Sequence, residues 1–276
     1  MPSRKARADR PRSARGKPVS ALQRGLAVLR CFEERAAPLS HGELARLTGI
    51  PKPSLTRLVA TLVAQGFLRL APESEHYLLG SAVVTLARSF LASFDMRTYA
   101  RPHMMALAED IGGWSYLGAR NGLEMVLIET CRSRSAVLRS RLDVGSRVPL
   151  ANSALGRAYL GALGARERND VLRQIRRSQP DEWPHLHAGI RRALLDFERR
   201  GYSASLGEWH PDVNSIAVPL RAPDGELMAL NWGGPAFAFP AAHIHKAVAP
   251  KLVHTARAIA QDIGGIALGS HAARAD

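Results

Sequence analysis

The chain has 276 residues, 46% of them hydrophobic and 22% charged, so most of it can bury a core and wholesale disorder is excluded. This length predicts one large or two modest domains and excludes a small stapled scaffold. Lys and Arg total 38 against 24 Asp and Glu, and the net charge of +14 favours a polyanionic partner such as nucleic acid.

The first 19 residues are rich in Arg, Pro, Ser and Ala and show no hydrophobic periodicity. Seven basic side chains and one acidic side chain give this segment a net charge of +6. We therefore expect residues 1–19 to form a disordered basic arm. An Arg-rich, acid-poor start is also typical of a mitochondrial transit peptide, so that interpretation stays open.

The two cysteines, Cys31 and Cys131, lie far apart in unlike contexts, which fits a reducing compartment better than a disulfide framework. We expect both to be inert core thiols. No run approaches the ~18 apolar residues of a membrane span, and the chain start lacks the apolar segment of a secretory signal. The sequence therefore predicts a cytoplasmic protein without a membrane partner.

Hydrophobic periodicity begins at residue 20. Ser20 stands at a position suited to a helix N-cap. An amphipathic stripe follows it, formed by Leu22, Leu26, Leu29 and Phe32.

A second helix is predicted between Ser40 and Gly49. Ser40 and Glu43 have the spacing of a capping box, in which each side chain bonds a backbone amide of the other residue. We expect this helix to bury Leu44 and Leu47 and to end at Gly49, which tolerates a left-handed conformation.

A third helix begins near Pro53, a residue suited to a first helical turn. Its outward face carries short hydroxyls and one guanidinium but no carboxylate, and the strand-like segments FLRL and HYLLG follow as a hairpin. Residues 20–80 thus predict a winged helix-turn-helix that inserts the third helix into a DNA groove. The predicted DNA contacts are Lys52, Ser54, Thr56, Arg57, Arg69 and His76.

Residues 81–95 carry a further helical pattern that is too apolar for a solvated linker. We expect this helix to pack on another apolar surface. Residues 96–264 then alternate between helical and strand patterns, as in an α+β domain that a helix over residues 240–263 closes. Residues 265–276 are rich in small side chains and are expected to fray.

Sequence motifs of common enzymes are absent. The chain has no GxGxxG, GxxxxGK[ST], HExxH, GxSxG or CxxC motif. The histidine pairs His185 with His187 and His243 with His245, and the separate His210, do not complete a tetrahedral ligand set. We expect surface or capping histidines rather than a metal site, no cofactor and no enzymatic activity.

The segment 201–217, GYSASLGEWHPDVNSIA, contains Gly201, Ser205, Glu208 and the run Ser-Ile-Ala from residue 215 at fixed spacings. This pattern resembles the signature of the IclR family of bacterial transcription regulators. The stretches TGIPKPSLTRLVATL, HYLLG, PLANSALGRAYLGAL and ALNWGGP resemble the same family in the expected order. The resemblance covers about residues 20–264.

The resemblance implies a winged helix-turn-helix, a linker helix used in dimerisation, and a GAF-like domain that binds a small organic acid. In members whose pocket is known, an Asp and a Cys of the signature and two serines of a later strand hold the ligand, together with backbone at a helix start. The corresponding residues here are Ser205, Ser215, Asn231 and Gly233 for the side chains and Ala154 and Leu155 for the backbone.

All four side-chain positions depart from the pattern of glyoxylate-binding members. Ser205 removes a carboxylate and Gly233 opens volume, so we expect a larger pocket and an aromatic or hydroxyaromatic acid rather than an aliphatic keto acid. The helix start near Ser153 offers amides to a carboxylate. Arg139, Arg141 or Arg147 is expected to assist. We expect Trp114, Tyr116, Trp209 and Trp232 in the core rather than in the pocket.

Two hypotheses follow. The first is a cytoplasmic regulator that binds double-stranded operator DNA as a homodimer or tetramer, responds to a small organic acid and contacts RNA polymerase, with activation and repression both open. The second is a metabolite-binding sensor or enzyme whose N-terminal module is a protein-interaction domain. The second needs a nucleophile and a base. Only Ser205, Glu208 and His210 resemble such a cluster, and their spacing does not support it.

Overall fold

The structure is a computed structural model that describes residues 19–33, 37–72, 74–93, 95–134 and 142–268. Contacts divide the chain into two units, Met1–Phe90 and Leu91–Asp276, and each is described by itself. The basic arm expected over residues 1–19 lies outside the described residues, apart from its last residue. Arg139 and Arg141 also lie outside them.

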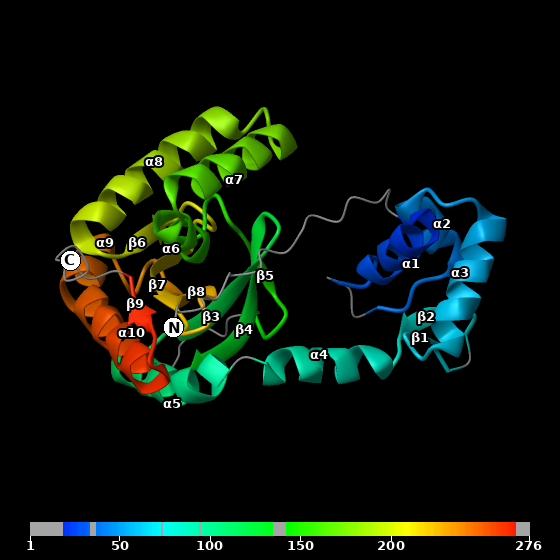
Figure 1. Cartoon of the computed structure of the whole chain (residues 1–276), viewed down its shortest axis with the longest axis horizontal. Helices are drawn as coiled ribbons and strands as arrows, with labels where there is room; N and C mark the ends of the chain where they lie inside the picture. The colour runs from blue at the N-terminus through cyan, green and yellow to red at the C-terminus, as the bar shows by residue number, and fades with distance from the viewer. Residues whose placement is uncertain (1–18, 34–36, 73, 94, 135–141, 269–276) are drawn as a thin grey trace, which may run out of the picture. The chain divides into compact units, whose positions relative to one another are not determined.

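The described part of the first unit contains three helices and a β-hairpin, drawn in blue to cyan in Figure 1. They are α1 (Ser20–Arg30), α2 (His41–Thr48), α3 (Lys52–Ala64), β1 (Leu68–Leu70) and β2 (Tyr77–Leu79). The two strands pair antiparallel, with Arg69 opposite Leu78. Buried side chains of all these helices and of β1 form one core, which includes Val28, Leu44, Leu55 and Leu68. The predicted winged helix-turn-helix is confirmed.

The capping box predicted for α2 is also confirmed. The Glu43 amide donates to the Ser40 hydroxyl at 3.2 Å, and the Ser40 amide donates to Glu43 Oε2 at 2.8 Å. The hydrogen bonds that the carboxylate accepts, from the Ser40 amide and from the Ser40 hydroxyl at 2.7 Å, hold the pKa of the Glu43 carboxyl below its ordinary value. Gly49 ends the helix with a φ of 67°, which glycine adopts without strain. Local contacts therefore determine the turn that leads into α3.

Three apolar positions expected in this core lie at the surface instead. Leu22 and Leu26 are 63% and 48% exposed, because only the last turns of α1 reach the core. Leu47 on α2 is also exposed. Ser20 is the first residue of α1 rather than its N-cap, which is Val19. The first turns of α1 therefore present an apolar surface to solvent.

The apolar pattern after residue 80 forms α4 (Ala82–Ala92), which crosses the boundary between the two units. Val84, Leu86 and Phe90 are exposed, and no side chain of α4 is buried in the described single chain. Among the described residues, the packing expected for this helix is found at its end, where the partly buried Leu91 packs against the core cluster of the second unit.

An antiparallel sheet forms the centre of the second unit, with seven strands in the described part of the chain. They are β3 (Trp114–Asn121), β4 (Glu124–Arg132), β5 (Arg147–Pro149), β6 (Ser203–Leu206), β7 (Val213–Arg221), β8 (Leu227–Pro235) and β9 (Ile266–Ala267). Their spatial order is β5-β4-β3-β8-β7-β6, and β9 pairs with β7.

Helices cover both faces of this sheet (Figure 1). On one face lie α5 (Asp95–Ile111) and α10 (Ala249–Ile263), and on the other lies α6 (Ala154–Ala162), against which α8 (Trp183–Arg200) packs. The remaining elements are α7 (Ala165–Ser178), α9 (Ala241–His243) and the π-helical turn η1 (Ile244–Val248). None of the described helices is long and apolar enough to cross a membrane.

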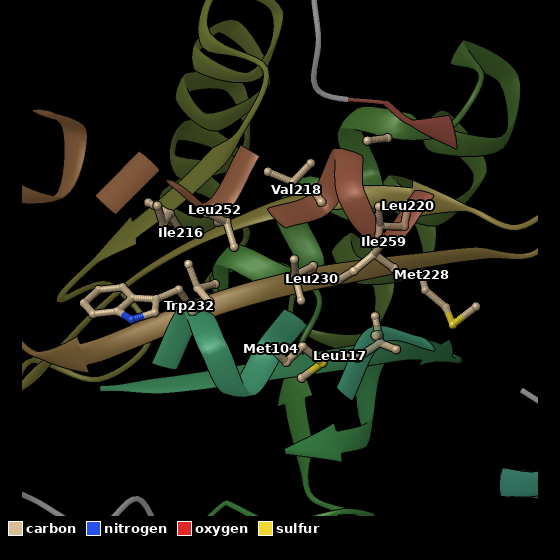
Figure 2. Packing of buried hydrophobic residues seen from close by; sticks show 14 of the residues in the cluster. Met104, Leu117, Ile216, Val218, Leu220, Met228, Leu230, Trp232, Leu252 and Ile259 are labelled. Carbon is tan, nitrogen blue, oxygen red and sulfur yellow. The ribbon is translucent and has the colours of Figure 1, made fainter. Parts of the chain in front are cut away.

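Strand side chains alternate between the two helical layers, because successive residues of a strand point to opposite faces. Figure 2 shows the layer beneath α5 and α10, where Ile216, Val218 and Leu230 pack against Met104 and Leu252. The opposite face of the sheet belongs to a second cluster around α6. The predicted α+β class is confirmed, and the sheet thereby separates a core from a face that holds the candidate site.

Three boundaries in this unit differ from the sequence prediction. Helix α8 starts at Trp183, four residues earlier than expected, because Pro184 occupies its first turn, where a proline is tolerated. The closing helix expected over residues 240–263 is interrupted by η1. Fraying expected from residue 265 is wrong for Ile266–Ala267, since these residues form β9.

Helix α6 approaches the preceding turn so closely that Gly156 cannot carry a side chain, because a Cβ there would collide with the Leu150 carbonyl. Gly156→Ala should therefore destabilise the second unit by about 1–3 kcal/mol in urea denaturation. Gly25→Ala in α1 is the control, since its Cβ would meet only Leu58 at 4.0 Å. Alanine should there stabilise the helix by about 0.5–1 kcal/mol. A Gly156→Ala variant as stable as the wild type would contradict the packing described.

Candidate functional site

Helix α3 carries four of the six residues predicted to contact DNA. Lys52, Thr56 and Arg57 are exposed, and Ser54 is half-buried. The side chains of Lys52 and Arg57 have no hydrogen-bond or ion-pair partner among the described residues, and α3 has no acidic residue. Two available cations and short hydroxyls are suited to phosphate and base-edge contacts.

The other two predicted DNA contacts lie on the hairpin, where Arg69 is exposed in β1 and His76 is half-buried before β2. His41, on helix α2, lies next to one of the predicted DNA contacts, and the sequence pattern did not identify it. The Thr56 hydroxyl donates to the Lys52 carbonyl at 2.9 Å and lies 3.1 Å from His41 Nε2. The sequence could not show this contact, because His41 belongs to the preceding helix.

Strand register brings the predicted effector residues together on the α6 face of the sheet. One row of neighbours across β6, β7, β8 and β3 consists of Ser205, Ser215, Gly233 and Trp114. In the adjacent row, Asn231 lies opposite Tyr116. Residues that are distant in sequence thus share one surface, because antiparallel strands place cross-strand partners side by side.

A cavity of about 370 Å³ lies between these rows and the start of α6. That volume is within the range of small-molecule sites. Its described lining comprises Trp114, Tyr116, Leu127, Leu142, Val148, Ser153, Ala154, Leu155, Trp209, His210, Asp212, Val213, Ser215, Asn231 and Gly233. Most of these side chains are aromatic or aliphatic, so the walls suit a flat apolar body.

The start of α6 supplies backbone donors to this cavity. Ser153 caps the helix by accepting a hydrogen bond from the Gly156 amide at 3.1 Å. The amides of Ala154 and Leu155 have no hydrogen-bond partner among the described residues. Unpaired amides at a helix N-terminus, together with the helix dipole, favour an anion such as a carboxylate.

Two polar side chains face the cavity from the sheet. The Asn231 amide nitrogen donates to the Ile216 carbonyl at 2.9 Å, and its Oδ1 has no partner among the described residues. This assignment of oxygen and nitrogen follows from the hydrogen bond that the nitrogen makes. The Ser215 hydroxyl likewise has no partner in the part of the chain that the structure describes. The sheet therefore offers an acceptor and a hydroxyl opposite the amides of α6.

Five of the six predicted effector residues line the cavity, and Ser205 does not. The Ser205 hydroxyl is buried and donates to the Asn152 carbonyl at 2.7 Å, so it supports the turn before α6. Arg147, expected to assist a ligand carboxylate, is not part of the described lining and pairs with Glu124 at 2.7 Å.

Three of the four aromatic residues expected in the core rather than in the pocket line the cavity. Trp114 and Tyr116 are at the same time buried members of the core cluster around α6, and Trp209 is partly buried against that cluster. For Trp232 the expectation is confirmed, because strand alternation places it on the opposite face, where it is fully buried (Figure 2). Its indole Nε1 donates to the Gly112 carbonyl at 2.8 Å.

An ion pair between a buried arginine and a half-buried carboxylate lies behind the cavity. Arg157 of α6 is 2% exposed, and its two terminal nitrogens donate to the carboxylate oxygens of Glu208 at 2.8 and 2.7 Å. Arg192 of α8 reaches Glu208 at 3.3 Å. The hydrogen bonds from Arg157 lower the pKa of Glu208, although burial opposes them. Glu208 belongs to the signature, but its partner lies 51 residues earlier and could not be found from spacing.

The cysteines and several other histidines lie in surroundings that indicate a structural role. Burial raises the pKa of the Cys131 thiol to about 11, which keeps it protonated. Cys31 is only half-buried, which differs from the core position expected, and its thiol donates to the Ala27 carbonyl at 3.4 Å. The His187 ring stacks on Trp183, and His245 Nδ1 lies 2.8 Å from the Tyr202 hydroxyl. Among the described residues, no group of three or more His, Cys, Asp or Glu could hold a metal ion.

Two family models match the chain. Residues 21–72 match the IclR helix-turn-helix domain. Residues 88–263, more than half of the chain, match the C-terminal domain of the bacterial transcriptional regulator IclR.

Similar proteins agree with these matches. The HTH-type transcriptional regulator TsaQ1/TsaQ2 of Comamonas testosteroni is 36% identical over 203 residues, which is 73% of each chain. A crystal structure of an IclR family transcriptional regulator from Brucella abortus has a TM-score of 0.81 at 37% identity and covers 91% of this chain and 96% of its own. An IclR homologue from Microbacterium hydrocarbonoxydans, complexed with 4-hydroxybenzoate, has a TM-score of 0.70 at 23% identity, with coverages of 89% and 99%.

The ion pair predicts a pH dependence of stability. Because the pKa of Glu208 is lower in the folded protein than its ordinary value of 4.5, the pair contributes stability above about pH 4.5, and this is lost as pH falls through the lowered pKa. Glu208→Gln should be less stable than the wild type at neutral pH. Its melting temperature should fall less than that of the wild type when the pH is lowered. Glu167→Gln, which removes an exposed partner of Arg120, is the control. Parallel acid profiles for wild type and Glu208→Gln would contradict this assignment.

Proposed function

This chain belongs to the IclR family of bacterial transcription regulators, and we propose that a small aromatic carboxylate, held in the cavity at the start of α6, controls its binding to operator DNA. The family comprises DNA-binding regulators rather than enzymes. The proposal goes further in naming the effector class, the residues that hold it and the residues that contact the operator.

The composition of the cavity carries the proposal for the effector. Trp114, Tyr116 and Trp209 supply flat walls, and the amides of Ala154 and Leu155 supply donors for one carboxylate. An apolar body with a single anionic group matches this arrangement. A two-carbon or three-carbon acid would leave most of the apolar wall unfilled.

The polar groups on the sheet favour a hydroxyl on the aromatic ring. Asn231 Oδ1 can accept a hydrogen bond from a phenol, and the Ser215 hydroxyl can pair with the same group. The homologue from Microbacterium hydrocarbonoxydans was crystallised with 4-hydroxybenzoate, a molecule with a carboxylate and a hydroxyl at opposite ends of one ring. We therefore propose a hydroxybenzoate-type acid as the effector.

The operator contacts are proposed to come from Lys52, Ser54, Thr56 and Arg57 on α3, with Arg69 and His76 on the hairpin touching phosphates. Exposed side chains and the lack of acidic residues on α3 support this assignment. We propose that the protein acts in the cytoplasm.

A second copy of this chain is the proposed partner of α4. Exposed Val84, Leu86 and Phe90 form an apolar surface that a solvated linker would not carry. A homodimer or tetramer that buries this surface would also place two recognition helices on two operator half-sites. Contact with RNA polymerase remains a prediction without an assigned residue.

Arg57→Ala should weaken binding to the cognate operator by about 1–3 kcal/mol per half-site, because it removes a cation suited to bidentate contact with guanine. A gel-shift titration at fixed salt measures this effect. Arg30→Ala, on α1, serves as a control that removes an exposed arginine outside α3. Unchanged operator affinity for Arg57→Ala would show that α3 does not read DNA through this residue.

Ser215→Leu should abolish the response to effector, because the added side chain fills the cavity and the lost hydrogen bond costs about 1–3 kcal/mol. Calorimetry with benzoates, hydroxybenzoates, glyoxylate and pyruvate tests both the site and the ligand class, while operator binding without effector should persist. Ile216→Leu, on the opposite face of β7, is the control. Wild-type affinity in Ser215→Leu would refute the site, and preference for glyoxylate or pyruvate would refute the aromatic assignment.

A further inference from the structure

Arg157 connects three segments that meet behind the cavity. Its Nε donates to the Ala151 carbonyl at 3.1 Å, in the turn before α6, and its Nη1 donates to the Ala204 carbonyl of β6 at 3.2 Å. Both terminal nitrogens also bind Glu208, at the end of the signature. Two of these three segments, the turn before α6 and the residues that follow Glu208, border the cavity, although Arg157 and strand β6 are not part of its described lining.

The segment that follows Glu208 is a wall of the cavity. Trp209, His210, Asp212 and Val213 all line it. Backbone hydrogen bonds close this segment on itself, from the Gly207 amide to the Val213 carbonyl at 3.1 Å and from the Val213 amide to the His210 carbonyl at 3.0 Å. We call residues 207–213 the signature wall. It faces solvent at residues 210–212, and it is attached to the rest of the fold through Glu208 and through the Asp212 carbonyl, which accepts from the Ala236 amide at 2.8 Å.

Helix α8 packs against the ion pair at Gly189. A Cβ on Gly189 would collide with Arg157 Nη2 and would lie 3.1 Å from Glu208 Oε2. Gly189 is buried, and only the absence of a side chain lets α8 pack at this distance. Helix α8 therefore covers part of the pair, and a side chain at residue 189 would displace it.

We infer that Arg157 and Glu208 are a positioning pair for the effector, which holds the signature wall at a fixed distance from the amides of Ala154 and Leu155. This inference rests on the proposed effector site. Neither residue touches the ligand. The pair acts by keeping the aromatic wall at Trp209 opposite the carboxylate donors of α6, so that a bound ring and its carboxylate are engaged together.

The chemistry of the pair explains why arginine is needed. The planar guanidinium serves four hydrogen bonds to three segments, which the single ammonium of lysine cannot reproduce in the same geometry. The carboxylate that neutralises the guanidinium also prevents a buried unpaired cation, which would be strongly destabilising. A positioning role thus predicts that Arg157→Lys keeps the charge and loses the geometry.

Three variants and two measurements test the inference. The variants are Glu208→Gln, Arg157→Lys and Gly189→Ala, the last of which displaces the pair without removing a charge. Asp196→Asn, which breaks the Arg200 pair on the same helix α8, is the matched control. Calorimetry uses 4-hydroxybenzoate as the probe, well below the melting temperature of each variant. Amide hydrogen exchange compares residues 207–213 with strands β3 and β8.

The positioning role predicts affinity for 4-hydroxybenzoate that is weaker by about tenfold or more in all three variants and unchanged in Asp196→Asn. Exchange should accelerate at residues 207–213 and stay at wild-type rates in β3 and β8. A purely structural role would instead lower the melting temperature, raise exchange throughout the unit and leave the affinity of the folded protein within about twofold of the wild type. Tighter binding by Glu208→Gln would also overturn the inference, because it would show that the negative charge of Glu208 repels the anionic ligand.

Failure of the proposed function gives a different result. If wild-type protein binds no benzoate of the panel, the effector proposal fails. The exchange measurement still tests whether the pair holds the signature wall. Wild-type exchange at residues 207–213 in all three variants would overturn the positioning pair whatever ligand the cavity takes.

Discussion

The ion pair between the buried Arg157 and the half-buried Glu208 is the interaction on which the geometry of the second unit depends. A guanidinium removed from water is costly unless it is paired and hydrogen-bonded, and here it uses three segments to satisfy its donors. The start of α6, strand β6 and the wall after Glu208 must therefore come together as one arrangement. Because the start of α6 and the wall after Glu208 line the cavity, the cost of an unpaired charge becomes a constraint on the shape of the site.

Local patterns in the sequence predicted much of the fold, because they depend on neighbouring residues. The capping box of Ser40 and Glu43 and the hairpin after α3 require no tertiary information. The strands could also be recognised. The sequence pattern does not show which face of the sheet lines a cavity. Period-two alternation places Trp114 and Tyr116 on one face and Leu117 on the other, but either face could pack in the core. For this reason Trp114 and Tyr116 were expected in the core and not in the walls of a cavity.

The candidate site was predictable only where a family pattern could be transferred. That transfer located Ser215, Asn231 and Gly233 around the cavity, while Ser205 is directed to the Asn152 carbonyl. A short hydroxyl next to a turn bonds the nearest backbone acceptor, whereas a longer carboxylate at the same position would extend further. The partner of Glu208 and the approach of α8 at Gly189 are tertiary features that one sequence does not display.

The central claim is that the unpaired amides at the start of α6 receive the carboxylate of an aromatic effector. The most direct measurement is a nitrogen–proton correlation spectrum of the protein, selectively labelled at alanine and leucine, during titration with 4-hydroxybenzoate and, separately, with 4-hydroxybenzamide. The account predicts saturable shifts of the Ala154 and Leu155 amides with the carboxylate and much smaller shifts with the neutral amide. Equal shifts with both compounds, or shifts confined to residues outside the cavity, would contradict it.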